Sequence, residues 1–373
     1  MKIAFFSNYY NHHQDALSKE FYKITNGNFR FIALKQLPEY RLNLGYPVIE
    51  RSYVILYSEN AEEANKWINE ADVLIFGSVP EKLIKRRIYD RDKITFRYSE
   101  RPLKNGTEWW KYIYRFIMFH YRNPHNKNLF LLCASSYTAF DYSLFALFKN
   151  KSYKWGYFPK IIYYDNIKEL ISKKNKMEII WCGRLIDWKH PDDVIMLANK
   201  LKKNNLNFHI KIIGDGEMKA KLKDMCSYYS LDKHITFLGN LPNEKVAEEM
   251  EQAGMFISTS DIKEGWGAVL NEAMSRGCAV IASKAAGSTD YLIDNGKNGY
   301  SYEYGNMNEL YNKTVCLLLD TNKQYDFGLK AYETIRKEWN AEVAAKRLVE
   351  MTKNIMDNKK IKTMYLSGPC SEA

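Results

Sequence analysis

The sequence predicts an α/β protein that contains two doubly wound domains. Short apolar runs typical of strands alternate with helix-periodic segments along almost the whole chain, as in parallel sheets covered by helices. The length of 373 residues exceeds a single ordinary domain of about 100 to 200 residues. A content of 46% apolar residues is sufficient for two packed cores.

The expected elements fall into two sets, one in each half of the chain. In the first half we expect strands at residues 2–8, 29–35, 73–78, 94–99 and 129–135, with helices at 61–70 and 80–90. In the second half we expect strands at residues 178–183, 208–214, 235–239, 255–259 and 279–283, with helices at 191–203, 216–229 and 243–253.

A polar, lysine-rich stretch at residues 166–176 separates the two sets. We therefore predict an N-terminal Rossmann-like domain at 1–165 and a C-terminal one at 166–357, whose last helix could pack back on the first domain. Residues 358–373 are expected to form a poorly ordered tail. Ligands bind at the carboxyl ends of the strands in such sheets, so we expect the two domains to face each other across a cleft that holds the site.

Charge and cysteine content limit the classes of partner and compartment. The formal net charge of +11 attracts phosphates of nucleotides, nucleic acid or anionic lipids, without choosing among them. None of the six cysteines is spaced as a zinc or redox pair, which favours reduced thiols in a cytosolic protein. The first apolar run is too short for a signal peptide, and none reaches the roughly 18 residues of a membrane span. We expect a cytoplasmic protein that meets a membrane only at its surface.

The segment with the strongest functional pattern spans residues 260–283. Gly265 and Gly267 flank Trp266 in a loop before an apolar helix, so the backbone can approach a ligand and the helix start can offer free N–H groups to an anion. Glu264 and Glu272 stand on either side of this loop, where they could hold hydroxyls at the two ends of one extended ligand. The alternative of equal weight is a solvated helix with two surface glutamates.

Two further strand ends carry glycine or cationic residues. Gly183 permits a tight turn, after which Arg184 and Lys189 offer a guanidinium fork and an ammonium group to phosphate oxygens. The alternative is two ordinary surface cations, against which their place at a strand's carboxyl end argues. Gly214 and Gly216 form a similar strand-to-helix turn, which by itself indicates only structure.

Together, five blocks in order between residues 178 and 305 resemble the retaining family 4 glycosyltransferases. The resemblance implies the GT-B fold, with the donor held mainly by the second domain. It implies that Arg184 and Lys189 grip the donor diphosphate, that Glu264 contacts the transferred sugar and that Glu272 contacts the ribose. The backbone that faces the donor would come from Gly183, Gly214, Gly216, Gly265, Trp266, Gly267, Ala268 and Val269.

The implied reaction moves a sugar, with retention, from a UDP- or GDP-linked donor to a glycan or lipid-linked acceptor, in surface polysaccharide synthesis at the inner face of the membrane. Neither a metal nor another cofactor is needed, because the two cations neutralise the leaving diphosphate. The alternatives are other nucleotide-sugar chemistry, as in an epimerase or phosphorylase, and a non-catalytic basic protein. We expect no nucleic-acid partner, because clustered Lys/Arg runs and reader motifs are lacking.

The first half departs from the family pattern, because no glycine-rich loop follows its first strand. Asn11 and Gln14 are instead spaced as a capping box, which puts His12 and His13 at a helix start. These histidines could face an acceptor or phosphate, or merely pack. Where many family members carry a histidine this chain has Glu100, a candidate for orienting or deprotonating the acceptor.

Two other patterns have plainer explanations. Asp90 and Asp92 resemble a metal-binding pair, but they precede a strand within a charged stretch, so we predict a solvated turn. The aromatic segment 108–122 carries Lys111, Arg115 and Arg122 within one arc of a helix. This arc suits a membrane interface or a lipid-linked acceptor, yet we expect a helix buried in the first domain with a wet edge.

Overall fold

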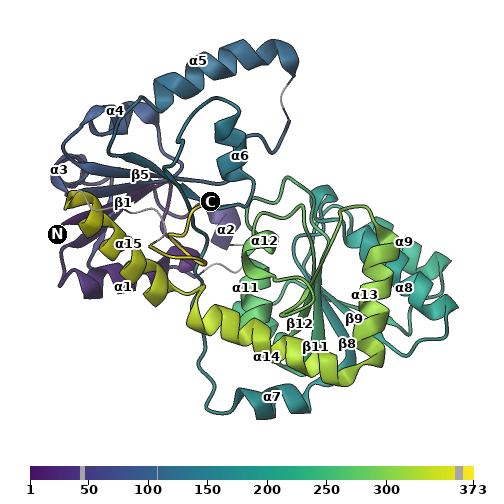
Figure 1. Ribbon diagram of the computed structural model, residues 1–373. Helices are drawn as coiled ribbons and strands as arrows, with labels where there is room; N and C mark the ends of the chain where they lie inside the picture. Colours follow the sequence, from purple (N-terminus) through teal and green to yellow (C-terminus); the bar gives the residue numbers. More distant parts are fainter. Residues whose placement is uncertain (43–46, 107, 358–363) are drawn as a thin grey trace. The chain divides into compact units, whose positions relative to one another are not determined.

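A computed structural model of the protein describes residues 1–42, 47–106, 108–357 and 364–373 (Figure 1). The chain divides into two compact units, an N-terminal unit of residues 1–160 and 338–373 and a C-terminal unit of residues 161–337. Each unit contains one parallel sheet with flanking helices. The predicted α/β class, with two Rossmann-like domains, is confirmed.

The N-terminal unit is built on a seven-stranded parallel sheet in the order β3-β2-β1-β4-β5-β6-β7. Its elements are β1 (Ile3–Ser7), α1 (His12–Ile24), β2 (Phe29–Ala33), α2 (Glu39–Leu42), β3 (Val54–Leu56), α3 (Ala61–Glu70), β4 (Val73–Phe76), α4 (Glu81–Tyr89), β5 (Ile94–Ser99), the 3-10 turn η1 (Trp109–Lys111), α5 (Tyr112–Arg122), β6 (Leu129–Cys133), α6 (Thr138–Ser143), β7 (Ser152–Lys154) and α15 (Ala341–Met356). Strands β3 and β7 were not predicted, because three residues at a sheet edge show no usable periodicity.

Helices cover both faces of this sheet. Successive side chains of β1 point to opposite faces, so each face receives apolar side chains from it. All five residues of β1 are buried, as in a central parallel strand. Phe6 joins a cluster with Ile68 of α3 and Ile84 of α4 on one face. On the other face, Phe21 of α1 stacks on Phe29 of β2, with ring centroids 5.5 Å apart.

The C-terminal unit is built on a six-stranded parallel sheet in the order β10-β9-β8-β11-β12-β13. Alternate side chains of its central strands form one large apolar cluster with α8, α9 and α13, and α14 lies against β11 and β12. Its elements are α7 (Ile167–Lys173), β8 (Asn175–Cys182), the 3-10 turn η2 (Asp187–Lys189), α8 (Pro191–Lys203), β9 (His209–Ile213), α9 (Lys219–Tyr228), β10 (Ile235–Gly239), α10 (Asn243–Gln252), β11 (Ala253–Ser258), α11 (Ala268–Ser275), β12 (Ala279–Ser283), α12 (Thr289–Leu292), β13 (Tyr300–Tyr302), α13 (Met307–Leu319) and α14 (Thr321–Lys337).

The C-terminal end of the chain returns to the N-terminal unit, a packing that the sequence analysis allowed for the last helix. Helix α15 belongs to the N-terminal unit, where it packs against α1. The prediction of a poorly ordered tail is wrong for residues 364–373, whereas residues 358–363 lie outside the described part. Lys154 of the edge strand β7 donates its N–H to the carbonyl of Ser371 at 2.8 Å, and Cys370 is 2% exposed. An edge strand has unpaired backbone groups, and this segment satisfies some of them.

Helix α5 corrects a second expectation. Figure 1 shows it at the periphery of the N-terminal unit, and none of its eleven residues is buried. The expected buried helix is therefore wrong, since packing on one side leaves most of its aromatic and aliphatic side chains in solvent.

Three smaller expectations can be compared directly. Asp90 accepts a hydrogen bond from the N–H of Asp92 at 2.9 Å between α4 and β5, which confirms the predicted turn. All six cysteines lack a disulfide partner. Across the described ranges, no helix combines the length and hydropathy that crossing a bilayer requires.

Each sheet has one point where the strand order reverses, and these points locate candidate sites. The order reverses between β1 and β4 in the N-terminal unit and between β8 and β11 in the C-terminal unit. Loops that leave neighbouring strands in opposite directions open a crevice there, at the carboxyl ends. The loops after β8 and β11 contain seven of the twelve site residues that were predicted in the C-terminal unit.

Candidate functional site

An ion pair joins the two loops at the reversal point of the C-terminal sheet. Lys189, at the end of η2 after β8, contacts the carboxylate of Glu264, in the loop after β11. Ser260 donates a hydrogen bond to Oε2 of the same carboxylate at 3.3 Å. The side chains of Lys189 and Glu264 are 14% and 15% exposed, so the pair is largely shielded but still reachable. The structure thus brings together two of the three predicted catalytic residues.

Buried polar groups beneath the pair hold the backbone of Lys189 in place. The indole N–H of Trp181 donates to the hydroxyl of Thr259 at 2.9 Å, and this hydroxyl donates to the carbonyl of Lys189 at 2.6 Å. The N–H of Asp261 donates to the carbonyl of Trp188 at 2.9 Å. The two loops are therefore held together independently of the ion pair. Sequence reasoning missed Thr259 and Ser260, whose only signal is their place at the end of a buried strand.

The environment of Glu264 keeps its carboxylate ionised. Burial by itself would raise its pKa, but Lys189, the hydrogen bond from Ser260 and the charge of Arg184 together lower the pKa below its ordinary value. Arg184 is exposed, with its guanidinium 5.3 Å from the centre of the Trp188 ring. The site therefore contains two cations and one carboxylate that is held in the charged form.

Helix α11 begins at Ala268, four residues after Glu264. Gly267 precedes the helix with φ of 86°, a left-handed conformation that favours glycine. The N–H groups of Ala268 and Val269 lie in the first turn, where a helix provides no internal acceptor. Trp266 is 1% exposed and donates to Asn271 at 2.8 Å, so only its backbone can meet a ligand. Gly265 is buried as well.

Glu272 lies in the second turn of the same helix. It is half-buried, and burial raises the pKa of its carboxyl, which nearby Arg276 partly opposes. Glu264 lies before α11 and Glu272 within it, and their carboxyl pKa values are shifted in opposite directions. This difference suits contacts with two different parts of a ligand.

The glycines of the neighbouring loops act through close backbone approach. Gly214 has φ of 132°, and a Cβ at this position would lie 1.9 Å from the carbonyl oxygen of Gly183. A Cβ on Gly216 would lie 2.4 Å from the carbonyl oxygen of Leu185, whose N–H donates to the carbonyl of Asp215 at 2.9 Å. A Cβ on Gly183 would lie 3.6 Å from Cδ of Lys189. These glycines set the shape of the loop that carries Lys189.

His190 was not predicted and occupies the entrance to α8. It has φ of 46°, and Pro191 follows it at the first helical position. Its Nε2 lies 2.8 Å from the hydroxyl of Tyr304 and 3.4 Å from Oδ2 of Asp261. This cluster supports the Lys189 loop from the side. Its only sequence signal is the His-Pro pair that follows Lys189.

In the N-terminal unit, two of the three acceptor-side candidates, His13 and Glu100, lie beside Tyr157. The capping box of Asn11 and Gln14 is present, so His12 and His13 do start α1. The ring of His13 lies 6.1 Å from that of Tyr157, whose hydroxyl donates to Glu100 at 2.8 Å. Burial, together with neighbouring positive charge, lowers the pKa of His12 to about 4 and that of His13 to about 3. Both histidines are therefore neutral near pH 7.

Comparison with known proteins gives the C-terminal unit a family context. Residues 164–334 match the family model described as glycosyl transferases group 1. In its C-terminal unit, this chain is similar to group 1 glycosyl transferases. The match covers β8 through β12 and so includes every C-terminal residue of the candidate site.

Two curated relatives each match less than half of this chain. An uncharacterized glycosyltransferase of Methanocaldococcus jannaschii is 25% identical over 185 residues, which cover 49% of this chain and 47% of the relative. The poly(ribitol-phosphate) alpha-N-acetylglucosaminyltransferase of Staphylococcus aureus is 30% identical over 163 residues, which cover 43% of this chain and 32% of the relative. The chain thus spans less than half the length of these relatives.

Solved structures extend the likeness to nearly the whole chain. HepE of Anabaena in complex with UDP matches 95% of this chain and 100% of its own, with a TM-score of 0.69 at 15% identity. The apo form of the lipopolysaccharide outer core galactosyltransferase WaaB matches 96% of this chain and 99% of its own, with a TM-score of 0.67 at 14% identity. At such identities the likeness concerns the fold, which is GT-B as predicted.

Proposed function

We propose that this protein is a glycosyltransferase that moves a sugar, with retention, from a UDP- or GDP-linked donor to a glycan or lipid-linked saccharide. One observation carries the proposal. Lys189 and Glu264 pair at the reversal point of the C-terminal sheet, with Arg184 nearby, and α11 begins four residues after Glu264.

The donor diphosphate binds to the cations and to the amide groups at the start of α11. Lys189 contacts a diphosphate oxygen while it keeps Glu264 as its partner, because an ammonium group has three donors. Arg184 is exposed and turns its fork toward the second phosphate. The N–H groups of Ala268 and Val269 complete the anion site.

The two carboxylates recognise the sugar and the ribose. Glu264 is ionised, so it accepts hydrogen bonds from hydroxyls of the transferred sugar. Glu272 has a raised pKa and a half-buried position in the second turn of α11, which suits the ribose hydroxyls. As the sugar bond breaks, negative charge grows on the diphosphate, and Lys189 and Arg184 stabilise it without a metal ion.

The acceptor binds on the N-terminal unit. Neutral His12 and His13 accept or donate hydrogen bonds to its hydroxyls, and Glu100, which is fixed by Tyr157, orients the reacting hydroxyl. An acceptor hydroxyl held on the same face of the sugar as the leaving diphosphate produces retention.

The comparisons support the donor and acceptor classes. The Anabaena neighbour was solved with UDP and with UDP-glucose. The named substrate of the S. aureus relative is a poly(ribitol-phosphate). We therefore place this protein in surface polysaccharide synthesis at the inner face of the membrane.

A panel of UDP- and GDP-sugars tests the donor proposal directly. A true donor binds only the folded protein and so raises its melting temperature. At a concentration of 100 times the Kd, the donor adds about 2.7 kcal/mol to the free energy of unfolding. Incubation of the labelled donor with saccharide acceptors, with and without a chelator, should release UDP or GDP and give a lengthened glycan of retained configuration by NMR. An isomerised donor or a sugar phosphate as product would instead establish epimerase or phosphorylase chemistry.

A further inference from the structure

Helix α5 presents an apolar stripe to solvent. Ile113, Ile117 and Tyr121 are spaced four residues apart on one helix face, and their exposed fractions are 72%, 61% and 51%. Trp110 and Phe116 extend the stripe with exposed fractions of 59% and 41%. Of the 22 large exposed hydrophobic residues in the described chain, seven lie between residues 110 and 121. Such a concentration indicates an interaction surface.

The opposite side of α5 holds the helix flat against the N-terminal unit. The ring of Phe119 packs 4.6 Å from Phe145 and 5.6 Å from Tyr142. Tyr112 stacks on Phe145 at 5.1 Å. The helix therefore lies along the surface of the N-terminal unit, and its apolar stripe is open to solvent.

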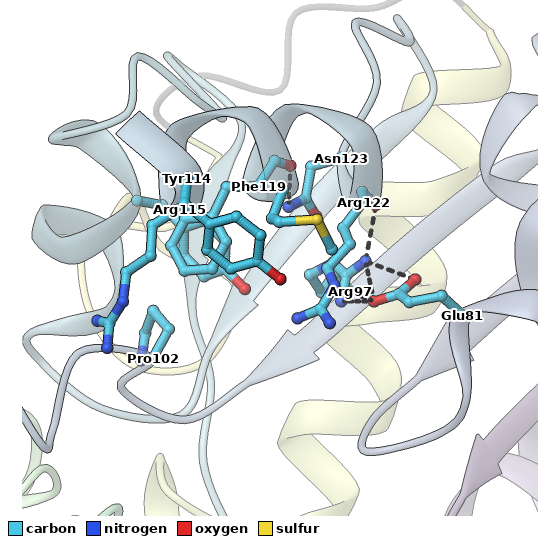
Figure 2. A pocket seen from close by; sticks show the side chains of 10 residues that line it. Glu81, Arg97, Pro102, Tyr114, Arg115, Phe119, Arg122 and Asn123 are labelled. Carbon is cyan, nitrogen blue, oxygen red and sulfur yellow. Dashed lines mark hydrogen bonds and ion pairs between the residues drawn. The ribbon is translucent and has the colours of Figure 1, made fainter. Parts of the chain in front are cut away.

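A pocket with three arginines lies beneath this helix. Arg97, Arg115 and Arg122 line a cavity of about 320 Å³ in which Glu81 is the single carboxylate among the lining residues. Figure 2 shows Arg115 beside Pro102 at one end of the pocket and Arg97, Arg122 and Glu81 at the other. Three guanidinium groups against one carboxylate leave a positive excess that favours an anion.

Two buried polar atoms at the pocket lack a partner within the described residues. Arg97 is 9% exposed and bonds to Glu81 and to the carbonyl of Arg122, yet its Nε–H has no acceptor. Asn123 is 3% exposed, and its Oδ1 has no donor. Buried polar atoms are ordinarily paired, so these two indicate a missing ligand that both accepts and donates hydrogen bonds.

We propose that α5 docks on an anionic phospholipid surface, with its apolar stripe in the interface and a headgroup phosphate in the arginine pocket. The charge around the helix is complementary to such a surface, because residues 109–140 contain four Lys/Arg and no Asp/Glu. Lys85 of α4 adds a further cation, 5.4 Å from the ring of Tyr121. Tryptophan and tyrosine among aliphatic side chains suit the headgroup region. A phosphate with a neighbouring hydroxyl satisfies both Arg97 and Asn123.

This inference deepens the proposed function, since it names the surface by which the enzyme reaches a lipid-linked acceptor. Its test needs no turnover. The protein is floated with vesicles of phosphatidylcholine alone or with about a third phosphatidylglycerol, at about 0.1 M and about 0.5 M salt. Wild type should float with the anionic vesicles at low salt and far less with the neutral ones or at high salt.

Two pairs of variants separate the apolar and the cationic contribution. Ile113→Asp/Ile117→Asp should lower partitioning about tenfold or more. Its matched control is Tyr228→Asp/Leu319→Asp, at exposed positions of the C-terminal unit, and should match wild type. Arg115→Gln/Arg122→Gln should lower anionic partitioning about 30-fold, at about 1 kcal/mol per cation. Lys330→Gln/Lys337→Gln removes the same charge from another surface and should have less than about a twofold effect.

Melting temperatures within about 2 °C of wild type show that exposed substitutions leave the fold intact. The proposal is overturned if wild type floats with neither vesicle, or if the Ile113/Ile117 variant floats as wild type does. It is also overturned if sedimentation shows a wild-type dimer that this variant converts to a monomer, because a second copy then covers the stripe. Transfer to a water-soluble acceptor without vesicles should be unchanged by Ile113→Asp/Ile117→Asp. If wild type and all variants lack transfer activity while wild type still floats with the anionic vesicles, only the proposed function is rejected.

Discussion

The ammonium group of Lys189 forms an ion pair with the carboxylate of Glu264, although the two residues follow different strands of the C-terminal sheet. Strands β8 and β11 are neighbours in that sheet, so their carboxyl-end loops meet. The pair is shielded enough to be strong and open enough to exchange with a ligand.

Lys189→Ala should reduce turnover about 100- to 1,000-fold, because it removes a cation that stabilises charge on the leaving diphosphate. The fold should survive, since Trp181 and Thr259 hold the backbone of the loop. Steady-state transfer assays and melting curves measure both effects. The control is Lys245→Ala, which removes an exposed lysine paired with Glu248 and should leave turnover unchanged. Near-normal turnover of Lys189→Ala would reject the role of this cation.

Glu264→Gln should separate nucleotide binding from sugar transfer. The amide cannot attract Lys189 as the carboxylate does, so Lys189 becomes freer to bind phosphate and the affinity for UDP should hold or rise. Turnover should fall about 100-fold, because the contact of an ionised group with the sugar is lost. Calorimetric titration with UDP and transfer kinetics give the two quantities. A parallel loss of UDP affinity and turnover would mean that Glu264 serves only to position Lys189.

Gly214→Ala should destabilise the C-terminal unit more than an ordinary glycine replacement. Both Gly214 and Gly296 have positive φ, so alanine is strained at either position by about 1 to 2 kcal/mol. Only at Gly214 would the new Cβ also lie 1.9 Å from the carbonyl oxygen of Gly183, whereas nothing lies within 4 Å at Gly296. In urea unfolding, we expect Gly214→Ala to lower the free energy of unfolding by about 1 to 3 kcal/mol more than Gly296→Ala does. Equal losses would show that the loops do not approach so closely.

The half-buried histidines His12 and His13 should make the protein acid-sensitive. Their pKa values are lowered to about 4 for His12 and about 3 for His13, below the ordinary value of 6.5. The unfolded chain therefore takes up protons as the pH falls through 6.5, while the folded protein does not until about pH 4 and below. Their contribution to stability is fully present above pH 6.5 and declines below it, by about 1 kcal/mol per histidine by pH 5.

His12→Gln/His13→Gln should remove that part of the pH dependence. The capping box of Asn11 and Gln14 remains in this variant, so the helix start is preserved. Urea unfolding at about pH 7.5 and at about pH 5 gives the difference in the free energy of unfolding. If the variant and wild type lose the same free energy of unfolding between these two pH values, the histidines are already protonated in the folded protein at the lower pH.

The local pattern of the sequence was enough to predict the class of fold and most of its elements. Helices α3 and α8 were predicted at their observed bounds, because apolar periodicity and a helix start at Asn60 or Pro191 are local signals. Buried parallel strands such as β1 and β6 are equally local, as continuous apolar runs. The residue types of the candidate site, with glycines beside Glu264 and cations after β8, were also visible in the chain itself.

What depends on strand order and packing became visible only in the tertiary structure. The pairing of Lys189 with Glu264 requires β8 and β11 to be neighbours, and the short edge strands β3, β7 and β13 exist only through their partners. The exposure of Ile113 and Ile117 was not predictable, because an apolar helix has the same sequence whether its face meets a core or the solvent. Burial depends on contacts between distant parts of the chain, and one sequence pattern is compatible with both outcomes.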